Sequence, residues 1–149
     1  METLYGKLEG DMREAMKAKD QLKLSVLRMI ISTARNVEME KNVKTLEDAD
    51  MLKILQKHLK QHKESITQFE KGGRHDLVSK ESAELVIIET YLPKQMTENE
   101  LTVIVKEAIA ETNAVSKSDT GKVMKAAMAK VQGRADGKVV SAIASGLLK

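Results

Sequence analysis

A single proline, Pro93, occurs in this chain of 149 residues. Because proline disrupts helices and no other is present, long uninterrupted helices can form on both sides of it. Aromatic residues make up only 2% of the chain and apolar residues 42%, so the core must consist of aliphatic and methionine side chains. Such residues suit packed helices better than a sheet sandwich. The sequence therefore predicts an all-α protein with a domain boundary at the proline.

Apolar residues recur three and four positions apart along most of the chain, which is the spacing of one face of a helix. Leu52, Leu55 and Leu59 begin one such stripe. The pattern predicts seven helices, over about residues 3–19, 21–41, 46–71, 76–92, 97–112, 119–131 and 136–148. We expect the first four to form an N-terminal helical bundle, residues 1–94, and the last three to form a small C-terminal domain, residues 97–149.

Helix-capping residues precede several of the predicted helices. They are Asp20, Thr45 with Asp48, Thr97 with Glu100, and Asp136. The pairs spaced three apart resemble capping boxes, in which each residue bonds the backbone of the other. Residues 86–88 favour β structure by local propensity, but the fourth helix is predicted to run through them.

The chain contains no cysteine, which excludes disulfides and thiolate metal sites. Its first residues lack the apolar core of a signal peptide. The longest stretch with little charge, residues 139–148, is too short to cross a bilayer. These features favour a cytoplasmic protein without a membrane partner.

Residues that could form a self-contained catalytic site are missing from the sequence. There is no glycine-rich phosphate loop and no cysteine nucleophile. His58 and His62 are one helical turn apart, a spacing that can bind a metal, but no glutamate lies between them as in zinc proteases. His62 also falls within the apolar stripe, which favours a hydrogen-bonded core histidine. We expect no catalytic residue, no metal and no cofactor.

Two glutamates, Glu81 and Glu84, share helix faces with apolar residues and are expected to point towards buried surface. An unpaired carboxylate in such a place is costly. Arg28 and Arg35 lie beside the apolar face of the second predicted helix. Structural ion pairs between these arginines and glutamates are the favoured interpretation. A general acid is the alternative, because buried carboxylic acids can take that role.

A turn that contains Arg74 and Asp76 precedes the fourth predicted helix. Backbone N–H groups at a helix N-terminus can bind an anion, and an adjacent arginine would help. Asp76 can occupy the same position as a helix cap, and this structural interpretation is the favoured one.

Positive charge is concentrated near the C-terminus, where residues 112–149 carry seven basic side chains and two acidic ones. Lysines, an arginine turn and glycines that permit close approach suit a phosphate backbone. The candidate RNA-binding residues are Lys117, Gly121, Lys122, Lys125, Lys130, Gly133, Arg134 and Lys138. Residues 97–149 contain no aromatic side chain for base stacking, so contacts with RNA would depend on backbone and shape. A solvated basic face is the alternative.

Five short segments, in this order and spacing, resemble the GatB/YqeY family. They are residues 72–77, Glu81 with Glu84, residues 91–95, residues 121–124 and residues 133–137. The resemblance covers nearly the whole chain and matches the stand-alone YqeY-like proteins. These are related to the C-terminal tail domain of the B subunit of glutamine-dependent tRNA amidotransferases. The resemblance implies an all-α fold with a three-helix C-terminal domain.

The resemblance also implies a function. In the amidotransferase, the domain similar to residues 97–149 helps to hold the tRNA. We therefore expect a non-catalytic, tRNA-binding-like adaptor whose partner is tRNA or another structured RNA. One alternative is an accessory of a carbon–nitrogen ligase with glutamine as amido-N donor, an activity of the large enzyme, whose kinase-like catalytic portion is missing here. The other is a protein–protein adaptor that binds no RNA.

Overall fold

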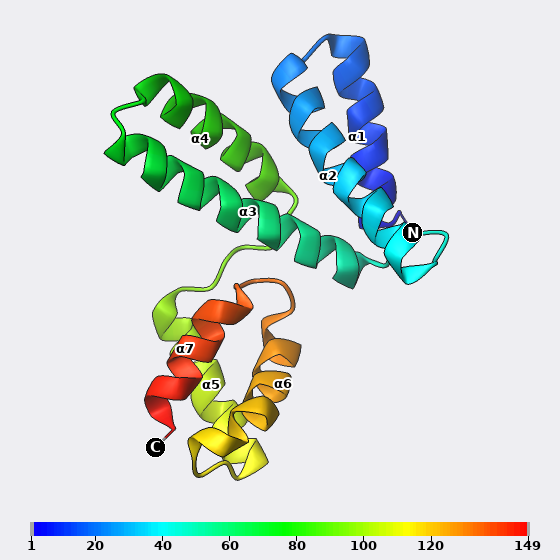
Figure 1. The fold of residues 1–149 in the computed structure, drawn as a ribbon. Helices are drawn as coiled ribbons and strands as arrows, with labels where there is room; N and C mark the ends of the chain where they lie inside the picture. Colours follow the sequence, from blue (N-terminus) through cyan, green and yellow to red (C-terminus); the bar gives the residue numbers. More distant parts are fainter. Residues whose placement is uncertain (1, 149) are drawn as a thin grey trace. The chain divides into compact units, whose positions relative to one another are not determined.

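The structure, a computed structural model, describes residues 2–148. These residues form seven α-helices and one 3-10 helix without any strand, which confirms the expected all-α class (Figure 1). The chain divides into two compact units, Met1–Leu92 and Pro93–Lys149. The first unit contains α1 to α4 and the second contains α5 to α7.

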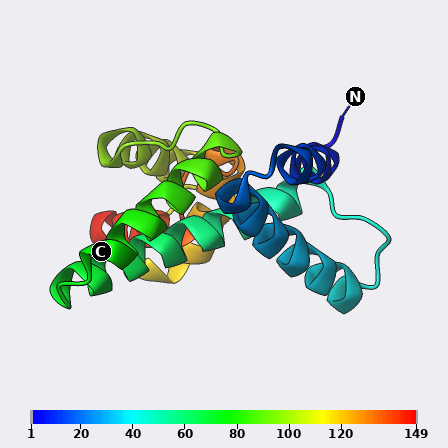
Figure 2. The same cartoon turned by 90° about the horizontal axis from the view of Figure 1, so that it is seen from above.

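Four helices build the first unit: α1 (Leu4–Ala18), α2 (Gln21–Lys41), α3 (Asp48–Lys71) and α4 (His75–Thr90). Two antiparallel pairs dominate the packing, α1 with α2 and α3 with α4, and α2 also contacts both α3 and α4. Figures 1 and 2 both show α3 and α4 lying side by side along most of their length. Helix α2 therefore joins the two pairs into one core.

The core of the first unit is formed by aliphatic side chains from all four helices. Leu27 and Ile30 of α2 are fully buried with Leu8 of α1, Leu55 of α3 and Ile88 of α4. Met16, in the last turn of α1, lies outside this core and is 50% exposed. Burial of one face stabilises each helix more than its intrinsic propensity does.

The β-favouring run at residues 86–88 lies inside α4, which confirms the helix predicted there. Ile88 is completely buried in the core, whereas Val86 is 60% exposed. A helix separates these two side chains onto different faces and buries one of them. Tertiary packing therefore overrides the local propensity of the run.

Three of the predicted helix caps are confirmed. Asp20 accepts a hydrogen bond from the Lys23 N–H, Thr97 forms a capping box at the start of α5, and Asp136 caps α7. The box expected at Thr45 is wrong, because α3 begins at Asp48 and Asp48 Oδ1 instead accepts the Leu4 N–H at 2.9 Å. Asp48 thus serves the first turn of α1, 44 residues away in the chain.

The second unit contains α5 (Glu98–Thr112), a 3-10 helix (Lys117–Asp119), α6 (Thr120–Val131) and α7 (Gly137–Leu147). All three α-helices pack against one another around a small aliphatic core. Val105, Val123, Val131 and Val140 are fully buried there. The core has no aromatic residue, so its stability depends on close packing of small side chains.

A buried tyrosine joins the end of α4 to α1. The Tyr91 hydroxyl donates a 2.6 Å hydrogen bond to Asp11 Oδ2, and the Lys7 ammonium lies 5.7 Å from the centre of its ring. Burial raises the pKa of the Tyr91 phenol, and the bond to the Asp11 carboxylate adds to this effect. Tyr91 therefore stays protonated in the folded chain at pH values where a free tyrosine ionises.

We expect Tyr91→Phe to lower the free energy of unfolding by about 1.5 kcal/mol, because it removes a hydrogen bond to a charged group. Since the raised pKa favours the protonated phenol in the folded state, this contribution is complete below about pH 10 and declines as the pH rises further. Urea unfolding of both proteins between pH 7 and pH 11 measures the difference. A difference that grows above pH 10 would contradict this role of Tyr91.

Candidate functional site

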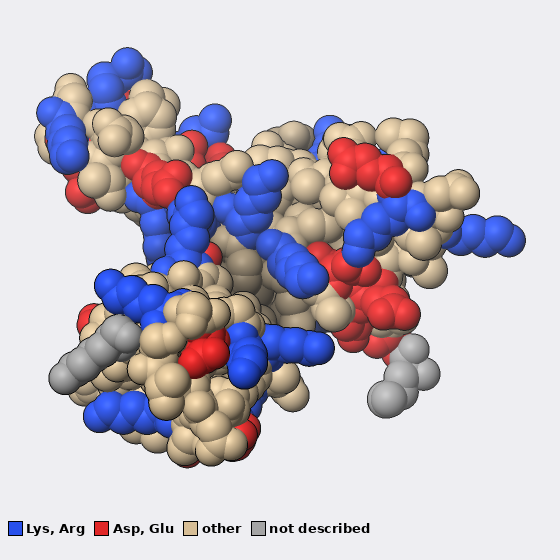
Figure 3. All heavy atoms as spheres, turned by 60° about the horizontal axis from the view of Figure 1, so that its bottom comes forward, with Lys and Arg blue, Asp and Glu red and all other residues tan. Residues whose placement is uncertain are grey.

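The candidate RNA-binding residues occupy three consecutive elements of the second unit. Lys117 lies in the 3-10 helix, Lys122, Lys125 and Lys130 lie on α6, and Lys138 lies in the first turn of α7. On the face in Figure 3, lysines and arginines are distributed around the second unit, at the lower left, and do not form one patch. The contacts of each basic side chain therefore determine whether it is available to a phosphate.

Helix α6 presents one exposed stripe that carries no carboxylate. Its members are Lys122, Lys125, Ala129 and Gln132, spaced three and four residues apart. The opposite face is anchored by Val123 and Val131 in the core. Gly121 lies beside the start of the stripe, and a Cβ atom built there meets no other atom within 4 Å. A polyanion could therefore approach both lysines and the helix backbone.

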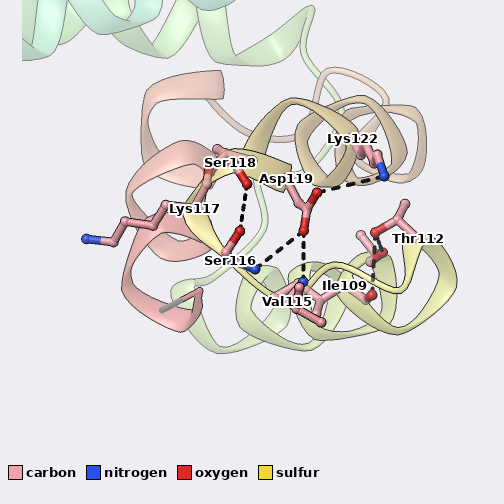
Figure 4. Close-up of polar contacts among 10 residues, drawn as sticks. Ile109, Thr112, Val115, Ser116, Lys117, Ser118, Asp119 and Lys122 are labelled. Carbon is pink, nitrogen blue, oxygen red and sulfur yellow. Dashed lines mark hydrogen bonds and ion pairs between the residues drawn. The ribbon is translucent and has the colours of Figure 1, made fainter.

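The turn before α6 is organised by Asp119, a residue that sequence reasoning did not select as functional. Its carboxylate accepts hydrogen bonds from the N–H groups of Val115 at 3.0 Å and Ser116 at 3.4 Å (Figure 4). These backbone bonds, followed by the charge of Lys122, lower the pKa of Asp119. The Lys122 ammonium is 3.8 Å from the carboxylate, an exposed ion pair of small energetic value.

Lys117 does not join the exposed stripe of α6. Figure 4 shows the Lys117 and Lys122 side chains pointing to opposite sides of the turn that contains Asp119. Both side chains are exposed. These two candidate residues therefore do not form one contact surface.

Lys130 is held by two glutamates of α5. Its ammonium lies 2.6 Å from Glu111 Oε1 and 3.5 Å from Glu107 Oε2. The hydrogen bond with Glu111 is the largest cause of the raised pKa of Lys130. Because two carboxylates already surround its charge, Lys130 joins α5 to α6 and is a poor contact for a phosphate.

Arg134 fastens the start of the second unit to the turn between α6 and α7. Its Nε donates to the Lys94 carbonyl at 2.8 Å, and the Met96 N–H donates to the Arg134 carbonyl, also at 2.8 Å. Gly133 has a φ of +78°, a conformation that favours glycine. The segments 91–95 and 133–137, which both carry the family resemblance, therefore meet at this point. A structural role accounts for Gly133 and Arg134.

The buried glutamates of α4 face a histidine instead of the arginines. His62 Nε2 lies 3.2 Å from Glu84 Oε2 and 3.4 Å from Glu81 Oε2. Arg28 and Arg35 are exposed and line a separate cavity of about 320 Å³ with Met12, Ile31 and Ser32. The ion pairs expected between these arginines and glutamates are therefore wrong. Glu84 is buried as expected, Glu81 is half-buried, and His62 is the partner of both.

The two histidines of α3 are both buried and hydrogen-bonded, as expected of core residues. His62 Nδ1 donates to the His58 carbonyl at 2.9 Å, and His58 Nε2 lies 3.1 Å from Thr33 Oγ1. Burial, followed by the charges of His62 and Lys57, lowers the pKa of His58. The side chain of His58 is therefore neutral at pH 7.

Helix α4 begins at His75, one residue earlier than predicted. Gly73 adopts a φ of +71° and the Arg74 N–H bonds back to the Phe69 carbonyl at 2.9 Å, so α4 starts at His75 with Arg74 at the cap position. Asp76 therefore lies inside the first turn and is not the cap. Arg74 binds its carboxylate through Nε and Nη2, both at 3.2 Å, which lowers the pKa of Asp76.

Within residues 2–148, no helix combines the length and the apolar character that a bilayer-crossing segment needs.

Residues 5–148 match the family described as Yqey-like protein. The chain belongs to the YqeY-like family. Relatives named "Altered inheritance of mitochondria protein 41, mitochondrial" occur in three yeasts. The Kluyveromyces lactis protein is 38% identical over 84 residues, which are 56% of this chain and 45% of the relative. The Vanderwaltozyma polyspora protein is 37% identical over 95 residues, 61% and 51% respectively.

The corresponding Saccharomyces cerevisiae protein is 34% identical over 94 residues, 63% of this chain and 51% of the relative. This YqeY-like chain therefore spans about half the length of the curated relatives it matches. All three names describe mitochondrial proteins, which contradicts the expectation of a cytoplasmic protein. The absence of cysteine shows only that no disulfide forms, and it does not distinguish one compartment from another.

Proposed function

We propose that the second unit of this YqeY-like protein binds the phosphate backbone of structured RNA, with tRNA as the leading class, and that the chain is a non-catalytic adaptor. The exposed stripe of α6 carries this proposal. Lys122 and Lys125 lie one turn apart on it, with open space beside Gly121, and the Asp119 carboxylate next to Lys122 forms only an exposed ion pair with it at 3.8 Å. Two cations on one accessible helix face can contact successive phosphates.

The proposed footprint is smaller than the eight candidate residues. Lys130 is surrounded by two glutamates, Arg134 and Gly133 hold the chain connection, and Lys117 points away from Lys122. Lys138 lies in the first turn of α7 and is exposed. Membership of the YqeY-like family supports the proposal through its resemblance to the tRNA-holding tail of the amidotransferase.

A titration with bulk tRNA at 50 and 200 mM salt tests the proposal. We expect affinity to fall steeply as salt rises, because phosphate contacts release counterions. The double variant Lys122→Ala/Lys125→Ala should bind about tenfold more weakly at the lower salt concentration, with a salt slope reduced by about two. Fluorescence anisotropy of labelled tRNA measures both quantities.

The matched control is Lys106→Ala/Lys117→Ala, which removes the same charge from other exposed positions of the second unit. It should retain affinity within about twofold of the original chain. Equal losses in both double variants would show a diffuse solvated basic surface and no specific stripe. No tRNA binding, together with co-purification of a protein, would favour the protein–protein adaptor, and glutamine-dependent amide formation would favour the ligase accessory.

A further inference from the structure

Three ionisable side chains of the first unit converge between α3 and α4. His62 Nε2 lies 3.2 Å from Glu84 Oε2 and 3.4 Å from Glu81 Oε2, and one potential ligand atom from each residue lies within 4.8 Å of the others. His62 and Glu84 are only 6% and 8% exposed. The convergence is therefore an internal feature of the bundle, separate from the lysine stripe of the second unit.

The hydrogen bond on the other side of the His62 ring determines what Nε2 can do. A carbonyl oxygen only accepts, so the 2.9 Å contact with the His58 carbonyl requires a hydrogen on His62 Nδ1. In the neutral ring, Nε2 then carries a lone pair directed at two carboxylates. Three such electron-rich groups repel one another unless a positive charge lies between them. A backbone carbonyl on Nδ1 is also the usual partner of a metal-binding histidine.

Two of the three distances between these atoms are close to those of ligands around one ion, and the third is within 4.8 Å. Ligand atoms at about 2.1 Å from a tetrahedral zinc ion are about 3.4 Å apart. The two His62–Glu distances, 3.2 and 3.4 Å, are close to this value. Direct charged N–H···O bonds are typically shorter, about 2.7 to 2.9 Å. The 3.2 Å contact with Glu84 also fits a hydrogen bond from Nε2, so a metal ion at this position would take the place of that proton and contact each group individually.

A cavity of about 360 Å³ opens next to the three side chains. It is lined by residues of α2, α3 and α4, among them Ser25, Gln61 and Ser65. These polar neighbours could hydrogen-bond water molecules that complete the coordination of an ion. Three protein ligands and an open position resemble the arrangement of accessible zinc sites more than closed structural ones.

The geometry points to a divalent transition-metal site formed by His62 Nε2 and the carboxylates of Glu81 and Glu84, with water from the adjoining cavity as a further ligand. One nitrogen and two carboxylate oxygens suit Zn²⁺, and the same set accepts Co²⁺ or Mn²⁺. The site differs from a His58–His62 pair, because His58 Nε2 is directed to Thr33. It is independent of RNA binding by the second unit.

The test uses the full chain after treatment with EDTA and titrates it with Co²⁺, whose visible absorption reports the ligands. We expect one equivalent to bind, Zn²⁺ to displace it, and Zn²⁺ to raise the melting temperature. Glu84→Gln should weaken Co²⁺ binding at least tenfold. Glu81→Gln should also weaken Co²⁺ binding at least tenfold. Because Glu81 is more accessible than Glu84, this variant still tests the site if Glu84→Gln fails to fold.

The matched control is Glu89→Gln, which removes an exposed carboxylate from the same helix and should leave Co²⁺ binding unchanged. Absence of a stoichiometric Co²⁺ spectrum, or binding that survives both Glu81→Gln and Glu84→Gln, would overturn the metal site. In that case a shared proton on His62 alone would hold the two carboxylates together.

Discussion

We expect Leu101→Ala to unfold most of the second unit at 37 °C while the first unit stays folded. Leu101 is 2% exposed and belongs to the aliphatic core formed by α5, α6 and α7. Truncation of a buried leucine to alanine costs about 2 to 5 kcal/mol, since it leaves a cavity. A helical unit of the size of residues 93–149 seldom has more than about 3 to 5 kcal/mol of stability.

Hydrogen exchange resolved by residue measures this outcome, because it separates the protection of the two units. Slow amides of α5 to α7 should lose protection in Leu101→Ala, and those of α1 to α4 should keep theirs. Val103→Ala is the control on the same helix, because Val103 is 56% exposed and its loss should change stability by less than about 0.5 kcal/mol. Simultaneous loss of protection in both units would show that they fold as one.

The second large effect is expected for His62→Leu, measured in EDTA. The substitution removes the ring whose Nε2 lies 3.2 Å from Glu84 Oε2 and 3.4 Å from Glu81 Oε2, so the two carboxylates lose this partner in a largely buried place. Breaking a buried charged contact by removing one partner typically costs about 3 kcal/mol or more. The smaller exposure of Glu84 makes it the more heavily affected of the two carboxylates. Urea unfolding should therefore show a loss of about 3 kcal/mol.

A second substitution distinguishes charge from packing in that result. His62→Leu/Glu84→Gln should recover more than half of the lost stability, because it removes the negative charge that lacks a partner. Glu89→Gln on the His62→Leu background should recover none of it, since Glu89 is exposed on the same helix. A His62→Leu protein as stable as the original would show that the histidine does not hold the two glutamates.

The helices could be predicted well from local patterns. Apolar spacing and cap residues such as Asp20 and Thr97 act within a few residues of the helix that they begin, so their physical effect is visible in the sequence. The capping box expected at Thr45 does not form, because its second residue, Asp48, has a partner that is distant in the chain. Asp48 bonds the Leu4 N–H, and no local pattern reveals a partner 44 residues away.

The partners of the candidate site residues could not be predicted, because they lie on other helices. The spacing of residues within one sequence does not show which helices pack together. Burial of Glu84 was visible from the face it shares, but its partner depended on how α3 rotates against α4. The loss of Lys130 as a phosphate contact likewise depends on Glu107 and Glu111 of α5. A sequence signal did exist for the histidine, since His62 lies in the same apolar stripe as Leu59.

The hydrogen bond from Arg134 to the Lys94 carbonyl fixes the chain directly after Pro93. Leu92 is buried in the core of the first unit, while the Lys94 carbonyl and the Met96 N–H are already bonded inside the second. Pro93 alone separates these anchored residues, and its ring restricts one of its two backbone torsions. The chain between Leu92 and Lys94 therefore keeps few freely rotating backbone bonds, and a glycine at position 93 would restore the torsion that the proline ring removes.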